Sequence, residues 1–490
     1  MNRGIVLFGI ALAAHLLIWE SSLGWNAMIF CLMVTAGMNW LKPEVFARTE
    51  VKALLGAWCY SALCVVLHHS DLSIVVYWLT AMVCIGYMQA ERVHFWGFGL
   101  VESARALFGG WFIALRGQMR ELLQASDLWQ PIRQLRLLLV PLAITAPFLV
   151  LYSSGNASFD SLGEWLGDRL SGLFALDIDW GRFIVFLLGW AFTLAFLGRR
   201  IGIQRLHAWS SKWGFNLDRR KIRERVLSGF LGPIPTMGLQ REYQTALLTF
   251  GALNGLLLLI NLLDIQSVWL FSGERTAAEL SQFVHTGTWS LIASIVLAMI
   301  VVLIFLRGNL NFFPNNLRLR QLVYVWLAQN AFLALSVAVR NAHYIGQYDL
   351  AHGRIVVGFF LLAVSFGLYS MYQKVAQRKT AFYLLQVNAI AVGLLLLMAS
   401  SLNWDGLITR YNLHFGNNDN HYLMYQLQNN LETLVEVAAT EQSDYITFNK
   451  IQYRCRRMDK RYQRMDWRSW NWSTYRQYRA IAPYREQWEE

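Results

Sequence analysis

Amide and carboxylate side chains lie inside stretches of this sequence that are otherwise apolar. Asn254, Asn261 and Asp264 are separated by seven and three residues, so they fall on one face of a helix over 245–265. Gln329 is a further amide in the middle of another apolar run. Burying such groups in lipid is costly unless they find partners. We favour a structural polar seam between helices; the alternative is a water-lined path for a substrate.

Ionisable residues gather around the two polar loops that follow. If both loops lie on one side of a membrane, His285 and the nearby carboxylates come close to Arg340. A His/Glu/Arg group of this kind suits proton coupling or pH sensing, or a simpler ion-paired lid, which we favour. The candidate positions in these loops are Glu274, Glu279, Ser281, His285, Arg340, Asn341 and Tyr344.

Other chemistries have little support in the sequence. There is no Walker A loop, dinucleotide-binding glycine motif, HExxH, nucleophile elbow or His/Cys metal spacing. Four of the five cysteines lie in apolar runs and no CxxC occurs, which is typical of small core residues. We therefore predict no catalytic residue, no metal and no cofactor.

The elements that must position the polar residues are membrane spans. Of the 490 residues 56% are hydrophobic and 15% charged, and the mean hydropathy is +0.33. A span needs about 20 mainly apolar residues. The sequence predicts an all-α polytopic transmembrane helix bundle of about eleven spans, with an amphipathic helix over 95–115 lying at the interface. The expected spans are 4–19, 23–41, 53–67, 72–89, 137–152, 183–198, 245–265, 286–306, 321–339, 355–373 and 381–400.

Lysine and arginine predict the orientation. With the N-terminus in the cytoplasm, the cytoplasmic loops carry 26 Lys and Arg and the opposite loops carry 5. This asymmetry is the positive-inside rule. It explains most of the net charge of +12 without nucleic-acid binding. An odd number of spans then places the tail, residues 401–490, outside the cytoplasm.

One cytoplasmic loop concentrates the basic residues. It divides the chain into N-terminal spans (1–200), a basic loop (201–243, with its charges over 199–242), C-terminal spans (244–400) and the tail (401–490). Within the loop, 217–230 reads as a short basic helix ended by Gly232-Pro233. In the simplest interpretation its basic side chains bind the anionic lipid headgroups. The alternative is that they form a docking surface for a cytosolic protein. The candidate docking residues are Arg219, Arg220, Lys221 and Arg223.

The tail shows two amphipathic stripes at helical spacing, which predict a small extramembrane helical hairpin joined near 441–443. Three tryptophans follow, and tryptophan favours the headgroup level, so we expect this module to rest on the outer face. The first stripe is Leu423, Leu427, Leu431, Leu434, Val435 and Ala438, the second is Ile451, Cys455, Met458, Tyr462 and Met465, and the tryptophans are Trp467, Trp470 and Trp472.

The same residues carry a family resemblance. The elements SxFVHxG at 281–287 and SVxxRNxxYI at 336–345, with 410–413, 419–423 and 467–472, resemble a family of bacterial multi-pass membrane proteins catalogued as a domain of unknown function (family 4173). The resemblance covers about residues 240–475. It implies a bacterial cell-membrane location and assigns no catalytic residue.

These patterns favour a non-enzymatic sensor or accessory component in a bacterial inner membrane. Its expected partners are the lipid bilayer and a cytosolic or membrane protein, and no nucleic acid is expected. A secondary transporter using the polar residues near Asn254, Asn261 and Asp264 is the second hypothesis. The third hypothesis is an enzyme that acts on a lipid-linked substrate. It ranks last because such an enzyme needs clustered acidic residues at the membrane surface, and the loops outside the cytoplasm offer few of them.

Overall fold

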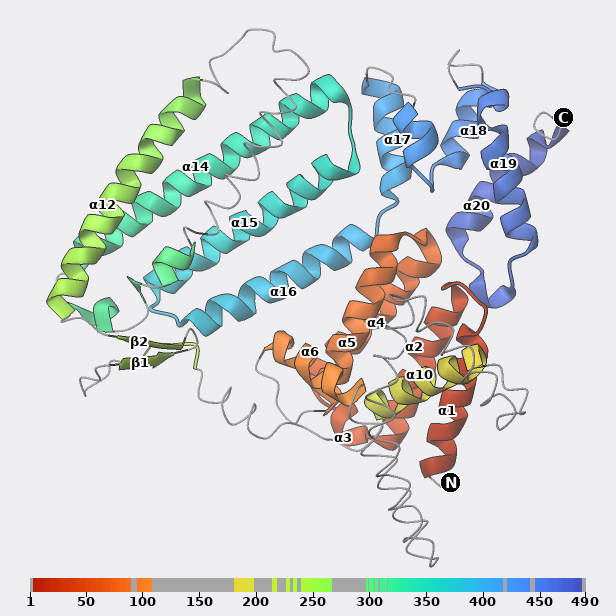
Figure 1. Cartoon of the computed structure of the whole chain (residues 1–490), viewed down its shortest axis with the longest axis horizontal. Coiled ribbons are helices and arrows are strands. Elements are labelled where there is room, and N and C mark those ends of the chain that lie inside the picture. The colour runs from red at the N-terminus through yellow and green to blue at the C-terminus, as the bar shows by residue number, and fades with distance from the viewer. Residues whose placement is uncertain are drawn as a thin grey trace, which may run out of the picture.

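The computed structural model describes residues 3–89, 95–107, 180–197, 214–217, 226–229, 232–235 and 239–266, most of 297–315, and then 316–416, 421–440 and 446–486. Apart from one two-stranded hairpin and a single bridge between Asn216 and Lys379, these residues form helices and their connections. Figure 1 shows three groups: N-terminal helices in red and orange, green and cyan helices beside them, and tail helices in blue.

The N-terminal group is built around a core that includes Trp58, Tyr77 and Phe30. His69 adopts the left-handed conformation (φ 46°) in the tight turn between the two longest helices. Gly86 and Gly99 allow the helices over 71–89 and 96–105 to pack closely. A Cβ on Gly86 would lie only 1.9 Å from the Gly99 carbonyl oxygen, so no larger residue fits there. The helices are α1 (Arg3–Ile18), α2 (Trp25–Leu41), α3 (Pro43–Phe46), α4 (Thr49–His68), α5 (Asp71–Gln89), α6 (Trp96–Arg105) and α10 (Trp180–Leu197).

The C-terminal transmembrane group has its own core, which includes Phe250 and Trp326. Its last helix packs against the preceding helix of this group on one side and against α4, α5 and α6 on the other, so that it joins the two groups (Figure 1). Phe382, near the start of that helix, is buried between Phe95 and Phe215. The helices are α12 (Leu239–Asp264), α14 (Leu317–Tyr348), α15 (His352–Ala376) and α16 (Ala381–Ser400), with a 3-10 turn over Asn309–Phe312.

Within the described residues, six helices are long and apolar enough to cross a membrane: α4, α5, α12, α14, α15 and α16. The chain is therefore a multi-pass membrane protein. The shorter α1 and α2 are also apolar. Of the other expected spans, 137–152 lies outside the described residues and 286–306 is described only in part. The α6 helix has ten residues and holds Glu102 buried in an ion pair with Arg105 (3.0 Å).

Two sequence-based expectations need correction. The expected loop after 339 is helix, because α14 runs on to Tyr348. Its 32 residues span about 48 Å, which exceeds the roughly 30 Å of hydrocarbon. The expected basic helix over 217–230 also fails at its end. Val226–Gly229 forms strand β1, paired antiparallel with β2 (Gly232–Pro235), and the glycines at positions 229 and 232 together with the proline at 233 disfavour a helix there.

The tail is helical and has a compact core of its own. The expected hairpin of two amphipathic helices is present, with the first stripe buried and Ile451, Cys455 and Met458 buried opposite it. The first stripe is divided, because Leu427 is extended between a π-helical turn over Tyr422–Gln426 and the next helix. The tail helices are α17 (Trp404–Phe415), α18 (Leu431–Ala439), α19 (Phe448–Gln463) and α20 (Trp472–Ile481).

Candidate functional site

The predicted polar residues of α12 lie along α14, and the two helices run parallel. Asn254 Nδ2 donates to the Leu322 carbonyl oxygen (3.0 Å), and Gln329 Nε2 donates to Asn254 Oδ1 (2.8 Å). One step further on, Asn261 Nδ2 donates to the Gln329 carbonyl oxygen (3.2 Å). Asn254 and Asn261 on one helix, and Leu322, Gln329 and Ser336 on the other, recur every seven residues. This is the spacing of parallel helices that share a seam.

An ion pair closes the seam at the last residue of α12. The guanidinium of Arg340 contacts the Asp264 carboxylate, and both residues are buried, at 7% and 5% exposure. The Ser336 hydroxyl lies close to the same carboxylate. An arginine and an aspartate without partners would be very costly inside a bilayer, and here each is the buried counter-charge of the other.

Three acceptor oxygens in this seam are buried and have no hydrogen-bond partner among the described residues. They are Asn261 Oδ1, Asp264 Oδ2 and Gln329 Oε1. Oxygens of amides and carboxylates suit a proton or a hard cation such as Na⁺. Of the part of the chain that the structure describes, no group of three or more His, Cys, Asp and Glu is arranged to hold a metal ion.

The other site residues predicted from the sequence do not belong to the seam. Asn341 Nδ2 donates to the Arg354 carbonyl oxygen (3.1 Å), and the Arg354 guanidinium lies over the Tyr344 ring at 4.3 Å. Asn341 and Tyr344 therefore hold the turn between α14 and α15. Glu274, Glu279, Ser281 and His285 lie outside the described residues, as do the docking candidates Arg219, Arg220, Lys221 and Arg223.

A second polar surface, which the sequence did not single out, joins the tail to the turns of both helix groups; we call it the tail interface. On the C-terminal side Asn412 makes a reciprocal pair of hydrogen bonds with Leu350: its amide donates to the carbonyl oxygen (2.9 Å) and its Oδ1 accepts from the backbone N–H (2.8 Å). His352 Nε2 lies 2.9 Å from Asp405 Oδ1.

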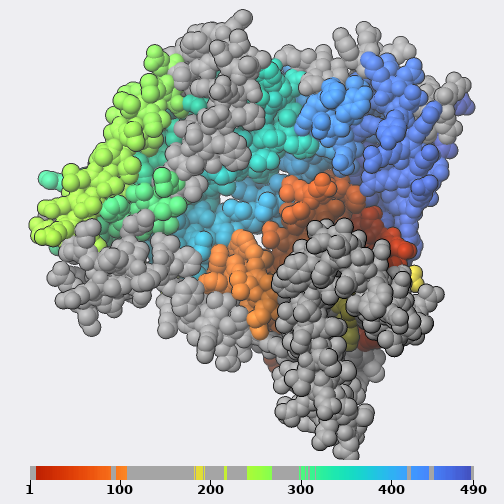
Figure 2. All heavy atoms as spheres, in the orientation of Figure 1, coloured from red at the N-terminus to blue at the C-terminus, as the bar shows by residue number. Residues whose placement is uncertain are grey.

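The tail interface continues on the N-terminal side. The Trp25 backbone N–H donates to the Trp470 carbonyl oxygen (3.0 Å), and the two indole rings stack at 5.9 Å. Arg468 donates to the Trp19 carbonyl oxygen (3.2 Å). Gly24 permits this approach, because a Cβ there would lie 2.5 Å from the Ser469 carbonyl oxygen. Figure 2 shows the blue tail continuous with both the cyan and the red helices.

Two titratable groups of the tail interface have shifted pKa values. Burial would raise the pKa of Asp405, but hydrogen bonds from His352 and from the backbone N–H groups of Asn429 and Gln428 outweigh it, and the pKa is lowered. Burial lowers the pKa of His69 to about 4, and the positive charge of Arg461 acts in the same direction. The fold therefore stabilises Asp405 as a carboxylate and His69 as a neutral imidazole, which are their forms at neutral pH.

We expect stability to fall as the pH drops from 6.5 towards 4, because His69 must stay neutral in the folded protein. Its folded pKa of about 4 lies below the ordinary 6.5, so the unfolded state binds more protons in this window. The loss should reach at most about 2 kcal/mol, since the side chain is partly exposed. Thermal unfolding of the wild type and of His69→Asn, which tolerates the positive φ, should diverge below pH 6.5; parallel curves would contradict this.

Comparison with known families identifies the family of this chain. The family described as Domain of unknown function (DUF4153) matches residues 54–436. The expected resemblance to a family of unknown function is confirmed, under the number 4153 instead of 4173. The match begins at residue 54 instead of about 240, so it includes α4, α5 and the basic loop as well as α12–α18. No curated protein and no solved structure matches the chain significantly.

Proposed function

We propose, from the premise that this chain belongs to the DUF4153 family, that the protein is a non-enzymatic sensor or accessory component of a bacterial inner membrane. In this proposal the tail responds to conditions outside the cytoplasm, and the helices pass the change to the basic loop 199–242. The observation that carries the proposal is the tail interface, in which one small module holds the turns of both helix groups through Asn412, Asp405 and Arg468.

The proposal includes about eleven spans with the N-terminus in the cytoplasm and the tail outside. The tail contacts turns at 19–25, 68–70 and 349–352, and all of these are non-cytoplasmic under the charge asymmetry, which supports this threading. In a variant without other cysteines, a membrane-impermeant thiol reagent should label Tyr453→Cys, which replaces an exposed tail residue, in intact cells. It should leave Arg220→Cys unlabelled. The reverse pattern would exclude the threading.

The coupling between tail and loop can be measured by hydrogen exchange in nanodiscs. Asn412→Ala removes the reciprocal bonds to Leu350 and should change amide exchange within 199–242. Tyr453→Ala is the matched control, because this tail residue is exposed. Unchanged exchange in the basic loop, with the tail visibly undocked, would exclude the sensor proposal.

Neutralising Arg219, Arg220, Lys221 and Arg223 should abolish binding of a cytosolic partner.

A secondary transporter is the alternative, favoured by the unpartnered oxygens of Asn261, Asp264 and Gln329. Protein reconstituted in liposomes that contain a pH-sensitive dye would then carry protons under an imposed gradient. Asp264→Asn would abolish the flux while the protein stays folded. The sensor proposal expects no flux above that of empty liposomes, so a robust flux that Asp264→Asn removes would replace it with the transporter.

A further inference from the structure

Two thiols meet at the middle of the N-terminal helices. Cys31 on α2 and Cys59 on α4 are 28 residues apart in sequence, and their Sγ atoms are 3.2 Å apart. A disulfide has an S–S distance of about 2.05 Å, so a small side-chain rotation separates this contact from a bond. Cys59 lies ten residues after Thr49 and nine before His68. It is therefore roughly 14–15 Å from either end of α4, at half the depth of a bilayer.

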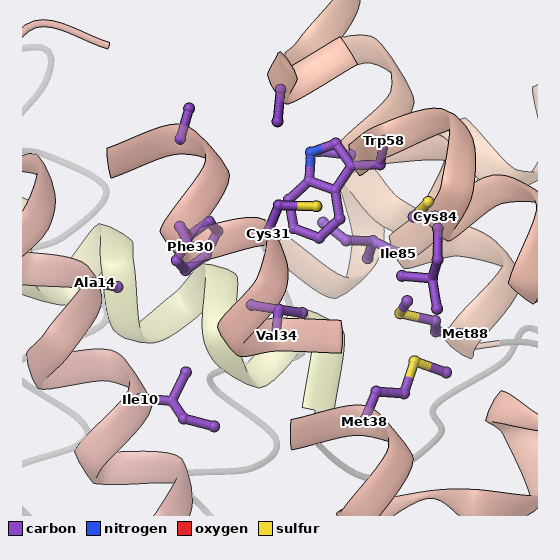
Figure 3. Close-up of a cluster of buried hydrophobic side chains, with 14 of the residues drawn as sticks. Ile10, Ala14, Phe30, Cys31, Val34, Met38, Trp58, Cys84, Ile85 and Met88 are labelled. Carbon is purple, nitrogen blue, oxygen red and sulfur yellow. The ribbon is translucent and has the colours of Figure 1, made fainter. Parts of the chain in front are cut away.

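The surroundings of the pair are apolar on one side and open on the other. Cys31 is fully buried, and Figure 3 shows its sulfur beside the indole of Trp58, with Cys84 nearby. Cys59 is half-buried, and its neighbours Tyr60 and Leu63 on α4 are exposed. These neighbours belong to a surface that faces lipid in a spanning helix. A reagent can therefore reach this pair from the hydrocarbon, whereas a charged reagent would have to enter it at high cost.

One polar group accompanies the two sulfurs. The Thr35 hydroxyl donates to the Cys31 carbonyl oxygen (2.8 Å) and lies close to both thiols. A thiol that reacts must give up its proton, and a neighbouring hydroxyl can stabilise the thiolate that remains by hydrogen bonding. Two other buried thiols differ: Cys84 comes from a third helix, and Cys64 lies near Ser400 of α16.

We propose that Cys31 and Cys59 form a reversible dithiol–disulfide pair that exchanges electrons with a lipid-soluble quinone. Oxidation breaks the two S–H bonds and forms one S–S bond between α2 and α4. The two electrons and two protons that are released pass to the two quinone oxygens and give the hydroquinone. Reduction by a hydroquinone reverses each of these changes. The pair would link the arrangement of α2 and α4 to the redox state of the membrane.

Thiol counting by mass spectrometry tests the proposal. Reduced protein in nanodiscs is incubated without oxygen with decylubiquinone, then denatured and alkylated. The wild type should take five alkyl groups before oxidation and three afterwards, and peptide mapping should identify a Cys31–Cys59 link. Cys84→Ser, the matched control, should go from four to two. Cys31→Ser and Cys59→Ser should each keep all four.

The mapping on wild-type protein decides the result even if a serine variant does not fold. Five reactive thiols after treatment with quinone, or a link that involves Cys64, Cys84 or Cys455, would overturn the proposal. Oxidised glutathione is the second probe and should oxidise the pair much more slowly than the quinone. Equal rates with the two oxidants would overturn the membrane route.

Discussion

Replacing Arg340 with alanine is expected to lower the free energy of unfolding by about 3–5 kcal/mol, because it leaves the Asp264 carboxylate buried without its charge partner. The double variant Asp264→Ala/Arg340→Ala should lose less, since removing both charges removes the desolvation cost as well as the attraction. Thermal unfolding of purified protein in one detergent, under identical conditions, measures both values.

The neighbouring Asn341→Ala provides the control for this comparison. It removes a hydrogen bond to a backbone carbonyl oxygen (3.1 Å) on the same helix but no charge, so its effect should be about 1 kcal/mol. If the double variant is as unstable as the sum of the two single variants, the residues do not act as a pair. The polar seam would then need a different physical explanation.

Arg454→Ala is expected to undock the tail's own helices from one another, with a loss of about 3 kcal/mol. Its guanidinium donates to the Met424 carbonyl oxygen and to Asn430 Oδ1 (both 2.8 Å), and more weakly to the Leu423 and Gln428 carbonyl oxygens (3.4 and 3.3 Å). Limited proteolysis should release tail fragments while the transmembrane helices stay intact.

Lysine at position 454 should restore only part of the stability, because a single ammonium cannot reproduce the planar fork that reaches several acceptors. The control is Arg457→Ala, an exposed arginine one turn along the same helix, which should leave the protease pattern unchanged. Equal sensitivity of the two variants would show that general loss of positive charge, and not this hydrogen-bond network, destabilises the tail.

The sequence predicted the parts of the fold that depend on local pattern. Hydropathy located α4, α5, α15 and α16 to within four residues, because each is a continuous apolar run, and it placed the end of α12 correctly but its start six residues too late. It ended α14 too early, since a hydropathy window treats Arg340 as a stop, and the side chain that neutralises it is 76 residues away. Charge likewise suggested a helix over 217–230, whereas Val226–Gly229 at its end pairs as a strand with Gly232–Pro235.

The candidate site was likewise predictable only where it depends on local sequence pattern. The spacing of Asn254, Asn261 and Asp264 predicted a shared helix face, but the partners on that face depend on how α12 and α14 are aligned. The tail interface was not foreseen, because Gly24, Asn412 and Arg468 look ordinary locally. Their roles arise from contacts between segments 62 to 449 residues apart, and no local pattern contains that information.

The parallel course of α12 and α14 has a consequence for biosynthesis. Neighbouring spans that run antiparallel can pair as a hairpin soon after they leave the ribosome, but α12 must wait until the chain has returned across the bilayer. Asp264 is therefore made 76 residues before its counter-ion exists. Such long-range contacts slow assembly, so a nascent chain halted before residue 340 should be the species that membrane quality-control proteases recognise.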